Sequence, residues 1–174
     1  EPADRSMVAD EYGSLLAGDE RSEPLANAVA GNAYGFGEYL DRRRLDEPLQ
    51  FETPDASLTY HGHCHAKALG TDHHAVAVLR RAGYEVDPLD SGCCGMAGSF
   101  GYEAEHHDLS LAIGDRLRAK LDESDGSVVV APGTSCRTQV GDFDGYERPI
   151  HPAEAVAAAL DDTVHGRSAP SSGD

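Results

Sequence analysis

Residues 58–94 decide the fold, and they read LTYHGHCHAKALGTDHHAVAVLRRAGYEVDPLDSGCC. The alternating segment 58–62 predicts a short strand, the periodic segment 72–82 predicts a helix closed by Gly83, and segment 84–89 predicts a second strand. A strand, a helix and a strand in this order form one βαβ unit, in which the two strands lie parallel.

The pattern continues toward the C-terminus. There we expect an amphipathic helix at 103–121, a buried strand at 127–131, a short helix near 135–140, a strand near 146–150 and a last helix at 153–160. The sequence therefore predicts an α/β fold, with a mostly parallel sheet of about four strands and helices on both faces.

The first fifty residues differ from this pattern. Two helices are expected there, an amphipathic one at 7–16 and another at 34–44, with too few apolar positions for a separate core. We expect a helical lead-in segment at 1–50, a cysteine-rich α/β domain at 51–161 and a disordered, polar tail at 162–174. Because the chain starts at Glu1 and not at Met, we expect it to be a piece of a longer protein.

The charge balance limits the partners. The chain has 31 Asp and Glu residues against 14 Lys and Arg residues, a net charge of −17, so it repels nucleic acid and anionic lipids. The acids are scattered, which suggests a host that lives in high salt. No apolar run approaches the ~20 residues of a membrane span, and the stretch EPADRSMVADEY at 1–12 lacks the pattern of a signal peptide. We expect a cytoplasmic protein that reaches a membrane only through its partners.

The four cysteines follow the ends of predicted strands. Cys64 follows the first strand, Cys93 and Cys94 follow the second, and Cys136 follows the third. Because the carboxyl ends of parallel strands meet at one edge of a sheet, these residues should converge there. Clustered cysteines in a reducing compartment are typical of metal ligands or redox groups. The alternative is that Cys93 and Cys94 are small buried residues beside a turn.

The loop around the cysteine pair, SGCCGMAGSFG at 91–101, is rich in glycine. Adjacent cysteines can face one site only if the chain turns sharply after them. We therefore expect Gly95 and Gly98 to adopt backbone angles, or to make close approaches, that a Cβ atom would obstruct. The glycine spacing does not match the dinucleotide-binding fingerprint, and no nucleotide site is predicted.

Three histidines surround Cys64 in the run HGHCHAK, at 61–67. Strand alternation would place His61, His63 and His65 on one face, away from the cysteine. Ligation of zinc by His61 or His65 is an alternative, but we expect these side chains to hydrogen-bond the site or one another. Elsewhere, His151 is expected to cap the final helix, and the remaining histidines are expected to be exposed on helices: His73, His74, His106, His107 and His165.

Four stretches resemble a known family: YHGHCHAKALG at 60–70, LDSGCCGMAGSFGYEAEHHDLSLAIGDRL at 89–117, VVVAPGTSCRTQV at 128–140 and RPIHPAEAVAAAL at 148–160. With them the chain resembles the cysteine-rich "CCG" domain family. It looks most like the C-terminal iron–sulfur region of FAD-linked 2-hydroxy-acid dehydrogenases and the iron–sulfur subunit of anaerobic glycerol-3-phosphate dehydrogenase. The cysteine-rich subunit of heterodisulfide reductase is a more distant relative.

The resemblance implies an electron-transfer domain. It implies an iron–sulfur cluster, expected as 4Fe–4S, with Cys64, Cys93, Cys94 and Cys136 as ligands and with His61, His65, Gly95 and Gly98 around them. The FAD would lie on another domain or subunit, the acceptor would be a quinone or another redox protein, and no catalytic residue is expected in this chain. The sequence departs from the family at Gly133, where a further cysteine often stands.

Two other functions stay open at this stage. Four thiolates also make a closed zinc site, so a zinc-stabilised structural or docking module is the main alternative. A thiol–disulfide enzyme using Cys93 and Cys94 ranks last, because a disulfide between adjacent residues closes a strained ring.

Overall fold

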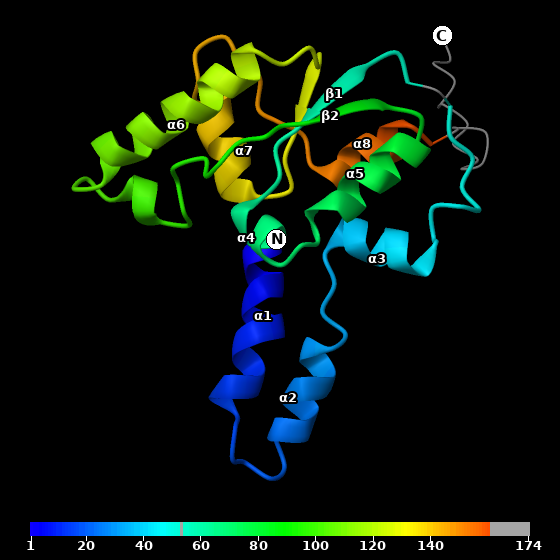
Figure 1. Ribbon diagram of the computed structural model, residues 1–174, viewed down its shortest axis with the longest axis vertical. Coiled ribbons are helices and arrows are strands. Elements are labelled where there is room, and N and C mark those ends of the chain that lie inside the picture. The colour runs from blue at the N-terminus through cyan, green and yellow to red at the C-terminus, as the bar shows by residue number, and fades with distance from the viewer. Residues whose placement is uncertain (53, 161–174) are drawn as a thin grey trace, which may run out of the picture.

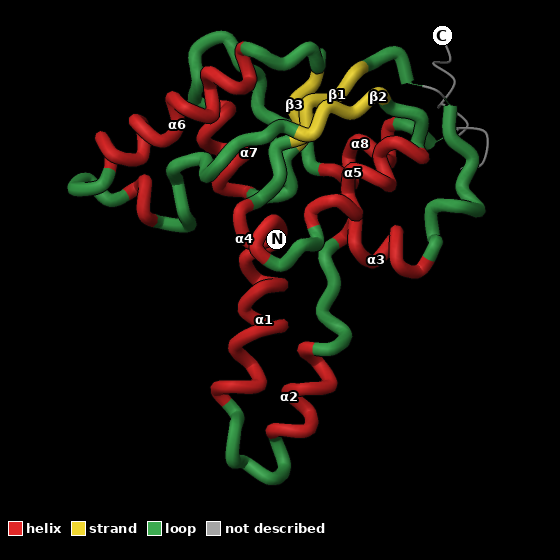
Figure 2. The backbone as a smooth tube through the Cα atoms, in the orientation of Figure 1, coloured by secondary structure: helices red, strands yellow, loops and turns green. Residues whose placement is uncertain are grey.

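The computed structural model describes residues 1–52 and 54–160. At its centre lies a parallel sheet of three strands in the order β2-β1-β3 (Figure 2). In the register, Leu58 pairs with Val86 on one side and with Val128 on the other. The strand bounds are β1 (Ser57–Tyr60), β2 (Glu85–Pro88) and β3 (Val128–Val130).

Helices cover both faces of the sheet, as Figure 1 shows. One face carries α3 (Phe36–Arg43), α5 (Asp72–Arg81) and α8 (Pro152–Ala158), and the other carries α6 (His107–Asp122) and α7 (Thr134–Gly141). Two apolar clusters fill these layers, one around Leu58, Val78 and Leu79 and the other around Leu117 and Val140. Burying each such side chain contributes roughly 1.5–3 kcal/mol. The expected α/β fold with helices on both faces is confirmed.

The sheet has three strands among the described residues, and the expected strand near 146–150 is reduced to one bridge. Ile150 forms a parallel bridge with Val130, in which Ile150 donates to Val129 and Ala131 donates to Ile150. Pro149, directly before the bridge, has no N–H to donate to a ladder. The prediction of a fourth strand is therefore not confirmed.

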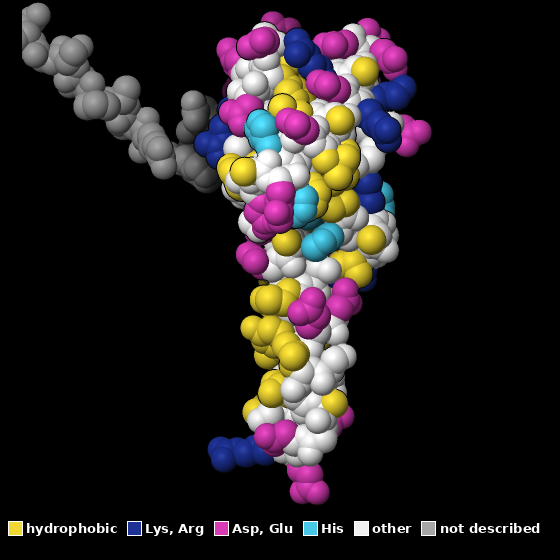
Figure 3. Space-filling view, turned by 90° about the vertical axis from the view of Figure 1, so that its left-hand side faces the viewer, with side chains coloured by type: hydrophobic (Ala, Val, Ile, Leu, Met, Phe, Trp, Pro, Cys, Tyr) yellow, Lys and Arg dark blue, Asp and Glu magenta, His cyan; other side chains and the backbone are white. Residues whose placement is uncertain are grey.

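A helical hairpin extends from the body. It consists of α1 (Pro2–Leu15) and α2 (Glu23–Ala30), the second of which was not predicted. The helix expected at 7–16 is observed as part of α1, and no residue of α1 is buried among the described residues. Figure 3 shows apolar side chains gathered along this hairpin. Its base is held by Glu38, a buried residue of α3 whose carboxylate lies 3.1 Å from Arg5 of α1.

One histidine expected on the surface is buried. His74 packs under α3, where its Nδ1 lies 2.5 Å from a carboxylate oxygen of Asp41. The cause is the register of α5, which turns His74 inward with Val78 at i+4. His73 and His107 are exposed and His106 is half-buried. His165 and the tail predicted at 162–174 lie outside the described residues.

Candidate metal centre

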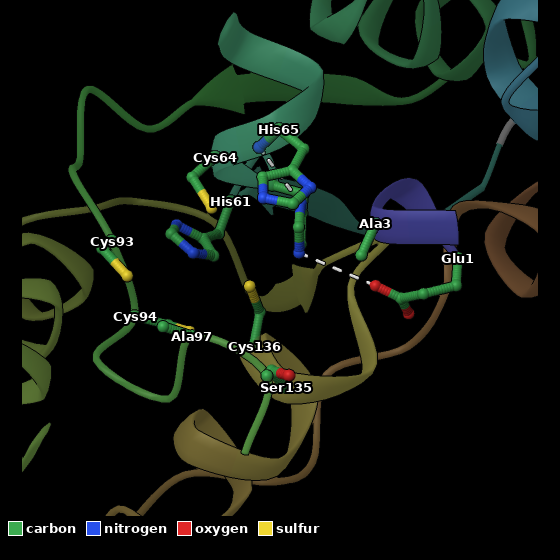
Figure 4. Close-up of a pocket in the computed structure, with 12 residues that line it drawn as sticks. Glu1, Ala3, His61, Cys64, His65, Cys93, Cys94, Ala97, Ser135 and Cys136 are labelled. Atoms are coloured by element: carbon green, nitrogen blue, oxygen red, sulfur yellow. Dashed lines mark hydrogen bonds and ion pairs between the residues drawn. The ribbon is translucent and has the colours of Figure 1, made fainter. Parts of the chain in front are cut away.

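The four cysteines line one pocket of about 230 Å³. Cys64 begins the short helix α4 (Cys64–Ala68) after β1, Cys93 and Cys94 lie in the loop after β2, and Cys136 lies in α7 after β3. Figure 4 shows the sulfurs of Cys64, Cys93 and Cys136 turned toward the same space. The convergence predicted from the strand ends is thus observed, since all three loops leave the same edge of the parallel sheet.

The three histidines of the run 61–67 line the same pocket as the cysteines. The prediction that His61, His63 and His65 point away from Cys64 is wrong, because the strand ends at Tyr60 and helix α4 starts at Cys64. Strand alternation therefore stops before these residues. His63 caps α4, accepting a hydrogen bond at Nδ1 from the His65 amide at 3.2 Å.

His61 is buried beneath the thiols. Its Nδ1 lies 2.8 Å from the Ser91 hydroxyl, which ties the end of β1 to the cysteine loop. Burial, followed by the nearby Lys67 ammonium, lowers the pKa of His61 to about 4. At neutral pH this imidazole is uncharged, so it supplies no positive charge to the site.

Neighbouring cysteine thiols shift one another's pKa values. The adjacent Cys94 thiol, followed by burial, holds the pKa of Cys93 far above its ordinary value. Cys136 raises the pKa of Cys94 to about 11, and burial followed by the neighbouring Cys93 raises the pKa of Cys64. Without a cation the thiols of Cys64, Cys93 and Cys94 therefore hold their protons. A bound metal would reverse this preference, because only thiolates ligate strongly.

The cysteine loop turns through residues with positive φ. Gly95 has φ +99° and Gly98 has φ +70°, which confirms the predicted need for glycine at both positions. A Cβ atom at Gly95 would also overlap the carbonyl oxygen of Ser110 in α6. The turn aims one backbone donor at sulfur, since the Gly95 amide lies 3.3 Å from Cys93 Sγ.

Position 133, where the family often has a further cysteine, has no space for a side chain. A Cβ atom at Gly133 would overlap the His63 ring and lie 3.3 Å from Cys136 Sγ. The packing of His63 therefore leaves no room there for a fifth thiol, and the site offers four.

Glu1 is a neighbour of the site that sequence reasoning missed. Its carboxylate accepts a hydrogen bond of 2.8 Å from the Thr134 amide, and its other oxygen lies 3.7 Å from His63 Nε2 (Figure 4). Thr134 is in the first turn of α7, where free amide groups attract anions. Nothing in the local sequence around Glu1 signals this contact, which joins residues far apart in the chain.

The spacing of the sulfurs bears on what they could hold. Among the described residues, the one group of three or more potential ligand atoms within 4.8 Å of one another is Glu103, Glu105 and His106, on the surface. No three of the cysteine sulfurs are that close. A tetrahedral zinc ion, with Zn–S bonds of about 2.3 Å, requires four sulfurs about 3.8 Å apart. The sulfurs as they lie therefore do not form the tetrahedral arrangement of a zinc site.

Comparison with known proteins agrees with this geometry. Residues 58–141 match the model of the CCG family, described as a cysteine-rich domain. The chain carries a cysteine-rich domain of the CCG family. All four cysteines lie within the matched residues, and so does the βαβ unit apart from Ser57, the first residue of β1.

Curated relatives of the chain are dehydrogenases. It is 34% identical over 121 residues to one subunit of the anaerobic glycerol-3-phosphate dehydrogenase of Escherichia coli (strain K12), a match that covers 68% of this chain and 30% of the relative. It is 31% identical over 159 residues to D-2-hydroxyglutarate dehydrogenase of the same organism, covering 90% of this chain and 15% of the relative. The chain thus spans less than a third of the length of these relatives.

Proposed function

We propose that Cys64, Cys93, Cys94 and Cys136 hold one iron–sulfur cluster, of the 4Fe–4S type, and that the CCG domain transfers electrons within a larger flavin-dependent dehydrogenase. The observation that carries the proposal is the meeting of four thiols from three separate loops in one pocket. Four cysteine thiolates are the usual ligand set of such clusters. When bound, the cluster supplies one-electron chemistry, which none of the side chains around it can supply.

The residues around the thiols suit that role. No Lys or Arg among the described residues lines the pocket, and the buried, uncharged His61 excludes water without adding charge. The Gly95 amide donates toward Cys93 Sγ, and hydrogen bonds to ligand sulfur raise the reduction potential of a cluster. We propose that His61, His65, Gly95 and Gly98 orient and shield the ligands without binding iron.

The substrate is proposed from the relatives. They are named as dehydrogenases of glycerol 3-phosphate and of D-2-hydroxyglutarate. We propose that the whole protein oxidises glycerol 3-phosphate or a 2-hydroxy acid of the lactate, glycolate and 2-hydroxyglutarate class on FAD held by another domain or subunit. A quinone or another redox protein would take the electrons. Among the described residues, no helix has the length and apolarity needed to cross a bilayer, and we propose that any membrane contact is made by partners.

The main alternative function is that of a zinc-stabilised docking module. Anaerobic purification followed by metal and acid-labile sulfide analysis separates the two. The proposal predicts about four iron and four sulfide per chain with broad visible absorption. One zinc per chain in a colourless protein would replace it with the docking module. The cluster is favoured because the four sulfurs do not form a ready tetrahedral zinc site.

A further inference from the structure

A second cavity lies on the outer side of the cysteine loop. It is a groove of about 470 Å³ between that loop and helix α6, within the size range of small-molecule sites. Cys93 lines both this groove and the four-cysteine pocket. Cys93 and Glu1 lie at opposite ends of the four-cysteine site in Figure 4, and Glu1 does not line the groove.

One face of α6 forms the far wall of the groove. Its members recur at helical spacing, so their side chains project in one direction. They are Ile113, Arg116, Leu117 and Lys120. The opposite wall is the loop 90–93, and this loop is held in place where Lys67 Nζ donates to the Ser91 carbonyl at 2.6 Å.

The α6 wall of the groove carries two basic residues, Arg116 and Lys120, although the chain has a net charge of −17. Lys120 pairs with Glu123 at 2.8 Å. Arg116 has no ion pair and no side-chain hydrogen bond with any described residue. The groove is thus lined by a guanidinium without an ion pair and by Cys93, with Asp90 as the acidic group on the loop side. A guanidinium binds carboxylate and phosphate through two parallel hydrogen bonds.

We propose that this groove binds a redox partner with a carboxylate or phosphate group, which Arg116 holds next to Cys93. The inference rests on the proposed electron-transfer function and names the partner of that same site. One electron leaves the reduced site through Cys93 and reduces the bound anionic acceptor by one electron, and no bond forms or breaks. The negative surface repels such an anion elsewhere, so the groove also selects where it docks.

The first test needs no cluster. In the cluster-free chain, iodoacetate and iodoacetamide both alkylate the thiolate, forming an S–C bond and releasing iodide, but only iodoacetate is an anion. Both reagents react with the same thiolate, so the fraction of Cys93 that is ionised cancels when the iodoacetate rate is divided by the iodoacetamide rate. This ratio therefore reports the electrostatic potential at Cys93. Peptide fragmentation in mass spectrometry assigns alkylation to Cys93, Cys94 or Cys64.

Arg116→Gln should lower this ratio at Cys93 about two- to fivefold, as expected for the loss of one partly screened charge at a surface groove. The ratio at Cys64 should stay unchanged. The matched control is Arg118→Gln on the same helix, whose side chain donates to the Asp144 carbonyl and does not line the groove. An unchanged ratio at Cys93, or an equal fall in the control, overturns the proposal.

The second test uses the cluster-loaded chain. Its oxidation by anionic ferricyanide should be several-fold slower in Arg116→Gln, while oxidation by cationic hexaammineruthenium(III) is not slowed. Equal effects on both oxidants would show that Arg116 does not recruit anions. If the chain holds no cluster but the alkylation ratio falls as expected, the electron-transfer function fails and the groove stands as an anion site.

Discussion

Gly95 and Gly98 lie in the same loop and both have positive φ, but their surroundings differ. A Cβ atom at Gly98 meets open space, whereas one at Gly95 overlaps the backbone of Ser110. The pair Gly95→Ala and Gly98→Ala therefore separates backbone strain from steric overlap. Both changes restrict the unfolded chain to the same extent, so that contribution cancels in the comparison.

The two substitutions should differ by about 2 kcal/mol. Gly98→Ala carries the left-handed backbone penalty alone, roughly 1 kcal/mol. Gly95→Ala adds the displacement of a helix backbone, and overpacking of this kind costs about 1–3 kcal/mol, so we expect a loss of about 3 kcal/mol. With a urea dependence of about 2 kcal/mol per molar, the unfolding midpoint should fall by about 0.5 M in the first variant and about 1.5 M in the second.

Urea unfolding of the cluster-free chain, followed by circular dichroism, measures both midpoints. Iron content after anaerobic reconstitution should fall more in Gly95→Ala than in Gly98→Ala, because the loop that carries Cys93 and Cys94 must move away from α6. Equal midpoints for the two variants, or a larger loss in Gly98→Ala, would refute the reasoning about Ser110.

Three further substitutions have expected outcomes. Cys94→Ser keeps the size but removes a soft ligand, so cluster loading should be abolished while the far-ultraviolet circular dichroism stays close to that of the parent. Gly133→Ala should reduce loading and lower the urea midpoint, because its Cβ would displace the His63 ring beside Cys136. Burial alone would raise the pKa of Asp41. Hydrogen bonds from His74 and Arg81 outweigh it and lower the pKa of this carboxyl below its ordinary value. Its contribution to stability is therefore present above the ordinary aspartate pKa of about 3.9 and is lost as pH falls below it. Asp41→Asn should flatten the pH dependence of the unfolding free energy between pH 5 and 3, and an unchanged slope would contradict this assignment.

The sheet and the meeting of the cysteines follow from local pattern. Strand and helix periods between residues 58 and 94 already specify a βαβ unit, and the geometry of parallel strands places Cys64 and Cys94 at one edge. The positive φ of Gly95 also follows from local chemistry, because adjacent cysteines need a turn to face one site. These inferences use only neighbours in sequence or the general geometry of a sheet.

The errors arise where tertiary contacts override local pattern. The alternating pattern predicted the wrong orientation for His61 and His63, because β1 ends at Tyr60, before the pattern does. His74 was expected on the surface but is buried by α3, which comes from a distant part of the chain. The capping of α7 by Glu1 and the lack of space at Gly133 likewise depend on contacts across the fold. Such contacts are not visible in single-sequence periodicity.

The central claim is that the four cysteines hold a redox-active cluster. Its most direct test is anaerobic reductive titration of the iron- and sulfide-loaded chain, followed by visible absorption. The account predicts that broad absorption bleaches on uptake of one electron per chain, returns on reoxidation, and is absent when Cys136 is replaced by Ser. A colourless chain that contains stoichiometric zinc and takes up no electrons would contradict it.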